Sequence, residues 1–576
     1  METQKNQPDQ SVPVDELQHV ARPVGAAWWQ QVTFAVILLL GIFYLVGLTQ
    51  TSYPMDSASS RQRLSYSREA VKPTVSRVDQ EFAEQWLAAG VEPNPPAEQT
   101  LVMRRLCLAL TGMQPSLEQL RWVEQFPEEE RLDQFLVHLL NDRSSHEYLA
   151  ERLARSWVGT EGGAFIVFRR RRFVDWIAEE LGRNRPYDQL VTELLTARGL
   201  WTDNEPVNFM TGHITPEENR LDQIRLTGRV SRCFLGMRLD CLQCHDDFTG
   251  TTEVGEPDAP REGLQTDFHS LASFFGQVQL SPTGLHDDLQ ADVYETALLG
   301  ETEPGPIDPA VPYGQQWLPE KTSERDAERK RFSTWLTDPR NRPFARSMVN
   351  RTWGLMFGKP MMEPVDDLPL YGPFPPGMEI LTDDFIDSGY DLRRLITVIA
   401  NSDPFRLDSR GEGLVTQEQE QLWASFPLTR VRPEQMAGIV HQSASLTRLD
   451  DASHVLVQLI RFGEQGDFLQ RFGDLGGDEF QRTGETVTQR LLLFNGKMIS
   501  ERLGQNGLPL NSVVEIAAHS PDPETVVRTV YRVVLTREPT KAEMDCYKPL
   551  VEENRREAVE DMFWVLVNSS ESLVNH

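Results

Sequence analysis

The segment RLDQFLVHLL, residues 131–140, places its large apolar residues at the spacing of an α-helix. At i, i+3, i+4, i+7 and i+8 it carries Leu132, Phe135, Leu136, Leu139 and Leu140. This spacing puts them on one helical face that can be buried. Upstream, Ser116 and Gln119 have the spacing of a capping box, which predicts the start of another helix. The chain is therefore expected to be mainly α-helical.

The same period returns near the end of the chain, in PETVVRTVYRVVLTREPTKAEMDCYKPLVEENRREAVEDMFWVLVNS, residues 523–569. Between the two helical parts, residues 281–325 are rich in Pro, Gly and acids, which predicts a connection with a short strand or two. A chain of 576 residues is too long for one core. We therefore expect a helical domain over 78–280, a connection over 281–325 and a second helical domain over 326–576.

The N-terminal part contains VTFAVILLLGIFYLVGL, residues 32–48, which has no charged residue. With the tryptophans before it, this run predicts a single transmembrane helix over 28–49, preceded by a polar tail over 1–27. The Ser-rich residues 50–77 predict a flexible linker. The predicted fold class is thus mainly α, with two helical domains behind a single N-terminal transmembrane helix.

Composition limits the partners. The chain has 86 acidic and 57 basic residues and a formal net charge of -29, which excludes a nucleic-acid surface because phosphate binding needs a basic face. The five cysteines are too few for a disulfide framework. The membrane is the first partner that the sequence predicts.

The most specific motif lies in RCFLGMRLDCLQCHDDF, residues 232–248. On a helical turn, Cys241, Cys244 and His245 fall at i, i+3 and i+4 and face one side. This is the arrangement that binds haem c, with two thioethers and one axial imidazole on the iron. Haem c requires an oxidising location. We therefore predict the cytoplasmic (inner) membrane with the body in the periplasm, although the arginines that flank the apolar run do not favour that orientation.

The motif leaves alternatives open. Zinc or another divalent metal would be held by the same three residues with His269 or an aspartate as the fourth ligand. A disulfide or an inert turn is the third interpretation. If His245 binds iron, the candidates for the sixth ligand are His213, His269, Met210 and Met237. Arg225, Arg229 and Arg232 form one helical stripe that is either a solvated face or a set of partners for haem propionates.

The flanks of the motif resemble a family. RVSRCFLGMRLDCLQCHDDF (229–248) followed by TDFHSLASFF (266–275) is similar to the planctomycete cytochrome-associated proteins, in which two domains of unknown function adjoin. FSTWLTDPRNRPFARSMVNRTWGLMFGKPMMEPVDDL (332–368) resembles the second of these two domains. Together, the resemblance covers roughly residues 78–565. It implies export and a haem inferred from CxxCH, but no settled activity.

The sequence departs from the family at two places. Asp247 stands where a second histidine is usual, and the Asp, Arg and Tyr of a W-x-D-x-x-R-Y stretch are not recognisable near SWVGTEGGAFIVF, residues 156–168. Asp366 and Asp367 match the family's paired acids, as Asn350 and Arg351 match its Asn-Arg. Paired carboxylates are the acid and base of many hydrolases, but adjacent acids also cap turns.

The sequence thus predicts a membrane-anchored, exported protein that acts in electron transfer or in a redox-coupled step of extracytoplasmic substrate breakdown. Its partners would be a redox protein or an extracytoplasmic polymer. One alternative is a metal-dependent hydrolase of such a polymer, with Asp366 and Asp367 as catalytic residues. Another is a non-catalytic scaffold, in which the cysteine turn only holds a loop.

Overall fold

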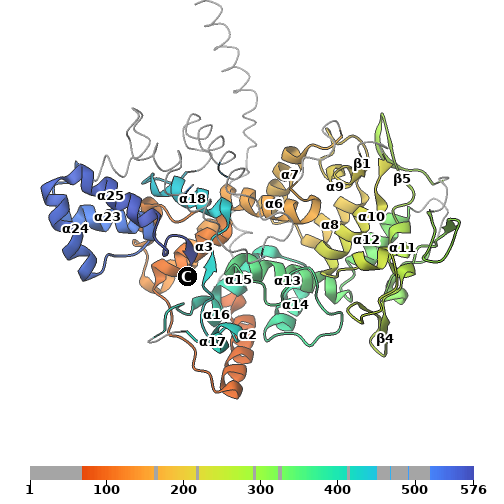
Figure 1. The fold of residues 1–576 in the computed structure, drawn as a ribbon, viewed down its shortest axis with the longest axis horizontal. Helices are drawn as coiled ribbons and strands as arrows, with labels where there is room; N and C mark the ends of the chain where they lie inside the picture. Colours follow the sequence, from red (N-terminus) through yellow and green to blue (C-terminus); the bar gives the residue numbers. More distant parts are fainter. Residues whose placement is uncertain are drawn as a thin grey trace, which may run out of the picture. The chain divides into compact units, whose positions relative to one another are not determined.

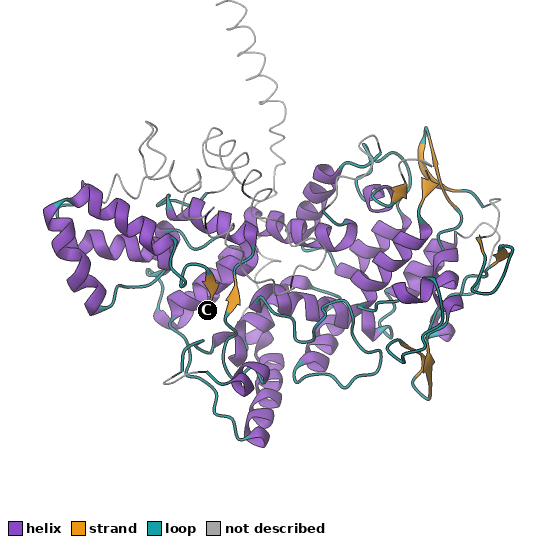
Figure 2. Ribbon diagram, in the orientation of Figure 1, coloured by secondary structure: helices purple, strands orange, loops and turns teal. Residues whose placement is uncertain are grey.

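The structure is a computed structural model, and it describes residues 68–160, 167–215, 220–289, 294–321, 327–411, 415–449, 468, 480, 491 and 519–576. Helices make up most of this part of the chain, and its strands are short (Figure 2). The prediction that the protein is mainly helical is confirmed.

The helices follow one another along the chain with few interruptions (Figure 1). The first part contains α2 (Arg68–Ala89), α3 (Gln99–Thr111), α4 (Leu117–Val123), η1 (Glu128–Glu130), α5 (Arg131–Leu140), α6 (Arg143–Val158), α7 (Arg170–Gly182), α8 (Tyr187–Thr196), α9 (Val207–Thr211), α10 (Gln223–Val230), η2 (Ser231–Leu235), η3 (Asp240–Gln243) and α11 (Gln265–Ser273). The second contains η4 (Gln315–Trp317), α12 (Glu328–Leu336), α13 (Arg342–Phe357), α14 (Met378–Asp387), α15 (Leu392–Asn401), α16 (Asp403–Arg406), α17 (Gln417–Gln421), α18 (Pro433–Ser443), α23 (Pro523–Leu535), α24 (Lys541–Glu553) and α25 (Arg555–Val567).

The described strands form antiparallel pairs rather than a larger sheet. The pairs are β1 (Ile214–Thr215) with β2 (Arg220–Leu221), β3 (Glu253–Glu256) with β4 (Ala259–Glu262), β5 (Val278–Ser281) with β6 (Gly284–Asp287), β7 (Glu295–Thr296) with β8 (Gly305–Pro306), and β9 (Thr429–Arg430) with β10 (Val574–Asn575). In β5–β6, Val278 lies opposite Asp287 and Ser281 opposite Gly284.

The predicted fold class is corrected in one respect. It included a single transmembrane helix, but in the described part of the chain no helix is long and apolar enough to cross a bilayer. Helix α2, the longest described helix, has 22 residues, which is long enough for a bilayer. It cannot cross one because it carries charged side chains along its length. The predicted span, 28–49, and the polar tail, 1–27, lie outside the described residues.

Local predictions from spacing are confirmed. Residues 131–140 form α5, and the apolar face predicted for it is buried apart from the half-buried Leu132. Ser116 and Gln119 form the predicted capping box: the Ser116 hydroxyl accepts from the Gln119 N–H, and the Gln119 side chain accepts from the Ser116 N–H. One boundary differs. Helix α2 begins at Arg68, inside the predicted linker 50–77, because Val71 and Thr74 are already buried against the body.

The larger hydrophobic cluster runs from α2 to the segment after α17. Its centre includes α13, where Trp353 stacks on Phe357 at 4.2 Å and lies 5.9 Å from the ring of Phe82 in α2. Helices α3 and α13 also pack against each other. Side chains from both predicted helical domains therefore contribute to one core.

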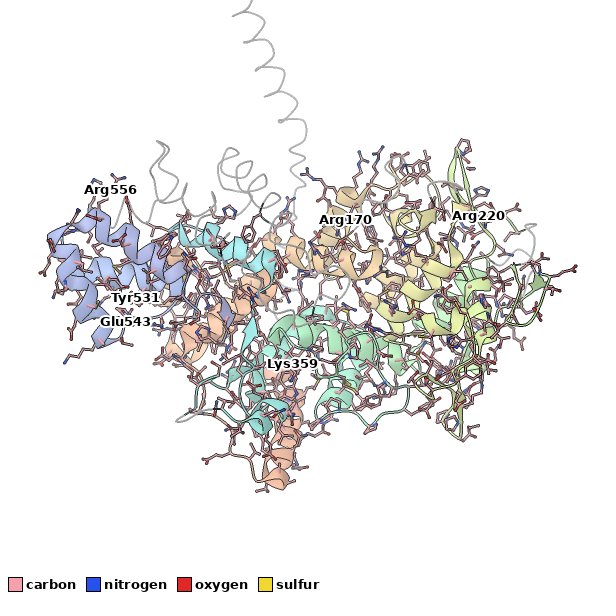
Figure 3. All side chains as sticks on the ribbon, in the orientation of Figure 1. Arg170, Arg220, Lys359, Tyr531, Glu543 and Arg556 are labelled. Atoms are coloured by element: carbon pink, nitrogen blue, oxygen red, sulfur yellow. The ribbon has the colours of Figure 1, made fainter. Side chains whose placement is uncertain are left out.

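A second cluster joins α18 to α23, α24 and α25, which pack together (Figure 1). Tyr531 of α23 and Glu543 of α24 lie close together (Figure 3), and Arg537 donates two hydrogen bonds of 2.9 Å to the Glu543 carboxylate. Two buried arginines of α3 connect this part to the rest. Arg104 donates to the backbone oxygen of Ser572, and Arg105 to that of His576. Helix α3 is thus shared by both clusters.

Candidate functional site

The cysteine motif lies on a short helical turn at the surface. A π-helical turn, η2, ends at Gly236 in the left-handed conformation, and the chain then enters the 3₁₀ turn η3. Leu239 and Leu242 are fully buried and anchor η3, whereas Cys241 and Cys244 are exposed and carry free thiols. The turn therefore presents both thiols to solvent. π-Helical turns are frequent beside functional sites.

His245 follows the turn and is exposed. Its Nδ1 lies 2.6 Å from the carbonyl oxygen of Asp246, so Nδ1 is the donor, and in the neutral imidazole Nε2 is the nitrogen with the lone pair. The imidazole stacks on Phe248, with ring centroids 5.7 Å apart and planes 21° apart. Histidines that bind a metal usually donate their other ring nitrogen in this way, because the bond fixes the tautomer and the ring orientation.

The two aspartates after His245 have structural roles. The carboxylate of Asp246 accepts from the backbone N–H of Gln265, the first residue of α11, at 2.8 Å. Asp247 is buried, and its carboxylate accepts the N–H and hydroxyl of Thr249 and the N–H groups of Gly250 and Thr252.

These bonds lower the pKa of Asp247 from 3.8 to about 2. The Thr252 N–H contributes most, burial opposes it, and the bonds from Thr249 and Gly250 add to it. Where the resemblance predicts a second histidine, this chain therefore has a carboxylate that folds the next loop.

The four predicted candidates for a sixth iron ligand are buried. Nδ1 of His213 lies 2.8 Å from the oxygen of Phe209, and burial lowers the pKa of His213 to about 3. Met210 and Met237 belong to the large hydrophobic cluster. His269 is the one that the structure brings to the motif.

Both ring nitrogens of His269 have partners. Nδ1 lies 2.9 Å from the hydroxyl of Tyr294, and Nε2 lies 3.1 Å from the backbone oxygen of Gln243, between the two cysteines. Burial lowers the pKa of His269, and the bond to Gln243 partly offsets that effect. This histidine therefore supports the turn from its inner side.

A preformed divalent-metal site is not seen near the turn. Among the described residues, no three His, Cys, Asp or Glu side chains converge in a way that would hold a metal ion. For the tetrahedral site of the zinc alternative, Cys241, Cys244 and His245 would have to move together with a fourth ligand, either an aspartate or His269 released from Gln243.

The predicted catalytic pair lies after α13. Arg238, three residues before Cys241, donates from Nε and Nη2 to Oδ1 of Asp366 at 3.2 and 2.9 Å. The N–H of Leu368 donates to the oxygen of Gly236 at 2.6 Å. Asp367 is exposed, and desolvation by its surroundings raises its pKa while Arg238 lowers it. The structure therefore brings the pair to the segment that leads into the motif, but Asp366 is engaged in an ion pair.

Asn350 holds the loop that carries these acids. Its amide nitrogen donates to the oxygen of Met362 at 3.0 Å, and its amide oxygen accepts from the N–H of the same residue at 3.0 Å. Asn350 is fully buried. The Asn of the Asn-Arg pair is thus a brace for the loop.

The arginine stripe before the motif is divided among structural partners. Arg229 donates to the backbone oxygen of Ser156 at 3.2 Å, and Arg232 donates from Nε to Oδ2 of Asp240 at 2.6 Å. Arg225 is exposed. Of the three, Arg232 lies nearest to the cysteine turn, because Asp240 is the first residue of η3.

Two family models match the chain. Residues 77–279 match PSCyt2, described as a protein of unknown function (DUF1549), and residues 328–458 match PSD1, described as a protein of unknown function (DUF1553). The chain belongs to the family in which these two domains adjoin. No curated protein and no solved structure is significantly similar to it.

The PSCyt2 and PSD1 regions meet at more than one place. The ion pair between Arg238 and Asp366 connects them. At a second place, both regions line an apolar cavity of about 40 Å³, with α3 and α6 from PSCyt2 and α13 and α15 from PSD1. None of the motif residues lines this cavity.

Sequence reasoning missed Gln265 and Arg238, which position the motif in the PSCyt2 region. Gln265 donates from Nε2 to the oxygen of Gln243 at 3.2 Å, and Arg238 holds the loop of Asp366. Neither residue type signals such a role on its own. The one hint for Arg238 is its place in the motif's flank, three residues before the first cysteine.

Proposed function

We propose that Cys241 and Cys244 bind one haem through thioether bonds and that His245 is an axial ligand of its iron. The protein would then act in electron transfer or in a redox-coupled step of extracytoplasmic substrate breakdown. The observation that carries the proposal is the exposed turn η3, on which both thiols are free. The anchoring leucines fix this turn, so the thiols stay at the surface.

Thioether formation needs no reactant besides the two thiols and the vinyl groups of the haem. Each thiol adds across one vinyl group, its sulfur to the α-carbon and its proton to the β-carbon, so nothing is oxidised and nothing leaves. When bound, the haem supplies one-electron redox chemistry. The hydrogen bond from His245 Nδ1 to the Asp246 oxygen leaves Nε2 as the ligand atom.

The same proposal assigns a compartment. CxxCH attachment is a feature of proteins matured in an oxidising compartment, so the described residues would work outside the cytoplasm. The acidic composition, with a net charge of -29, suits a surface that approaches a basic redox partner.

The metal-dependent hydrolase alternative receives no support from a specific contact. Asp366 accepts two hydrogen bonds from Arg238, so its carboxylate is not free to act as a base until that pair opens. Zinc at the cysteine turn would need the two thiols to turn toward a fourth ligand, either an aspartate or His269 released from the Gln243 oxygen.

The experiment is production of the protein with a cytochrome c maturation system, followed by pyridine haemochrome spectra and intact mass measurement. We expect one haem per chain in the wild type and none in Cys241→Ala/Cys244→Ala. The matched control is Cys546→Ala, which removes another exposed thiol and should retain the haem. A colourless wild type, with or without stoichiometric zinc, would contradict the proposal.

A further inference from the structure

Three large apolar side chains lie exposed on segments that follow the cysteine turn in the chain or are connected to it by hydrogen bonds. The exposed fraction is 77% for Phe248, 41% for Leu264 and 69% for Leu299. A single exposed leucine is ordinary on a protein surface, but a group of large apolar side chains usually marks a binding surface. We call Phe248, Leu264 and Leu299 the apolar collar.

One residue, Gln265, brings the collar and the motif together. Its N–H donates to Asp246, and its Nε2 donates to the oxygen of Gln243, between the cysteines. Its Oε1 accepts from the N–H of Leu299 at 2.8 Å. Leu264 directly precedes it in the chain.

Gln265 itself is buried. The same buried residue therefore binds the backbone of the motif and the backbone of Leu299, and it adjoins Leu264 in the chain. The hydrogen bonds of Gln265 define where the segments of Leu264 and Leu299 lie, so the two exposed leucines occupy fixed positions.

The third member of the collar acts on the axial histidine. Phe248 stacks on His245, and its ring is otherwise open to solvent. Charged groups lie near Leu264 in the chain: Arg261 donates two hydrogen bonds of 2.7 Å to the Asp267 carboxylate. Apolar side chains surrounded by polar ones are typical of a surface that covers an apolar group.

We propose that the apolar collar is the surface that covers the haem bound at Cys241 and Cys244. This inference rests on the proposed function. The occupant follows from attachment: a macrocycle tethered to these two thiols cannot leave, so it meets the segments of Leu264 and Leu299, which Gln265 connects to the motif. Phe248 is then a positioning residue that orients His245.

The collar has two expected consequences. Covering apolar side chains by the haem removes their area from water, which stabilises the haem-bound protein over the haem-free one. Excluding water also favours the less charged ferrous state, which raises the midpoint potential.

The test compares the same substitutions with and without haem. In the haem-bound protein, Leu264→Ser/Leu299→Ser should lower the Tm by about 2–3 °C and lower the midpoint potential. In the Cys241→Ala/Cys244→Ala background the same pair should lower the Tm less, because no haem covers the two leucines there. The matched control is Leu87→Ser on α2, 84% exposed, which should change neither quantity in either background.

The outcomes separate the two proposals. A wild type without haem would overturn both. A haem-bound wild type in which the collar substitutions change the Tm equally in the two backgrounds, with an unchanged potential, would overturn the collar and leave the haem proposal standing. Phe248→Leu adds a spectroscopic readout: we expect an altered axial-histidine signal in the paramagnetic NMR spectrum of the ferric protein, and an unaltered one would remove Phe248 from the collar.

Discussion

The sharpest prediction concerns Asp247, because the two oxygens of its carboxylate have different partners. Oδ1 accepts from Thr249 and Gly250, whereas Oδ2 accepts the N–H of Thr252 at 2.6 Å. Asp247→Asn keeps Oδ1 as an acceptor but replaces Oδ2 by an amide nitrogen, which donates and cannot accept. The substitution therefore removes the Thr252 bond and leaves that N–H facing another donor.

The magnitude follows from that bond. A hydrogen bond to a charged group contributes about 1.5–3 kcal/mol, so opening of the loop 249–252 should become easier by that amount. Since each 1.4 kcal/mol is a factor of ten, amide exchange at Thr252 should accelerate roughly 10- to 150-fold. Hydrogen exchange followed by mass spectrometry or NMR measures it.

The pH dependence has a defined sign. The pKa of Asp247 is lowered from 3.8 to about 2, so its contribution to loop stability is complete above 3.8 and is lost as the pH falls from 3.8 to about 2. Protection of Thr252 in the wild type should fall over that range, whereas in Asp247→Asn it should not depend on pH there.

The control and the refutation are simple. Asp258→Asn changes an exposed carboxylate in the turn of the β3–β4 hairpin that follows the loop and should leave exchange at Thr252 unchanged. Equal protection of Thr252 in Asp247→Asn and the wild type would refute the loop-folding role of Asp247. We also expect Asp247→His, which removes both carboxylate oxygens, to loosen the loop.

Two further predictions concern buried ion pairs. Arg329 donates to both oxygens of Asp287 at 2.6 and 2.9 Å, so Arg329→Ala should destabilise the fold by about 3–5 kcal/mol in denaturant unfolding, unlike the exposed control Arg340→Ala. Burial would raise the pKa of Glu434, but Arg152 and Arg432 outweigh it and hold that pKa at about 2. The wild type should therefore lose stability as the pH falls from 4.5 to about 2, whereas Glu434→Gln should be less stable above pH 4.5 and lose less stability over that range. An unfolding free energy with the same pH dependence in both proteins would contradict this.

Spacing within a few residues predicted much of the local structure. The apolar period of 131–140 became α5, and Ser116 and Gln119 became a capping box, because both depend on neighbours three or four residues apart. The turn of Cys241 and Cys244 was recognisable for the same reason. The predicted transmembrane helix is the correction, since no described helix is long and apolar enough to cross a bilayer.

The helical character, the cysteine turn and the membership of the family could all be predicted from the amino-acid sequence. Two contacts could not: Asp366 pairs with Arg238, 128 residues away, and Gln265 joins the cysteine turn to Leu299. The physical reason is range. A helical period is set by adjacent turns of the chain, whereas the partner of a carboxylate or an amide depends on which distant segments pack together, and no spacing in the sequence records that.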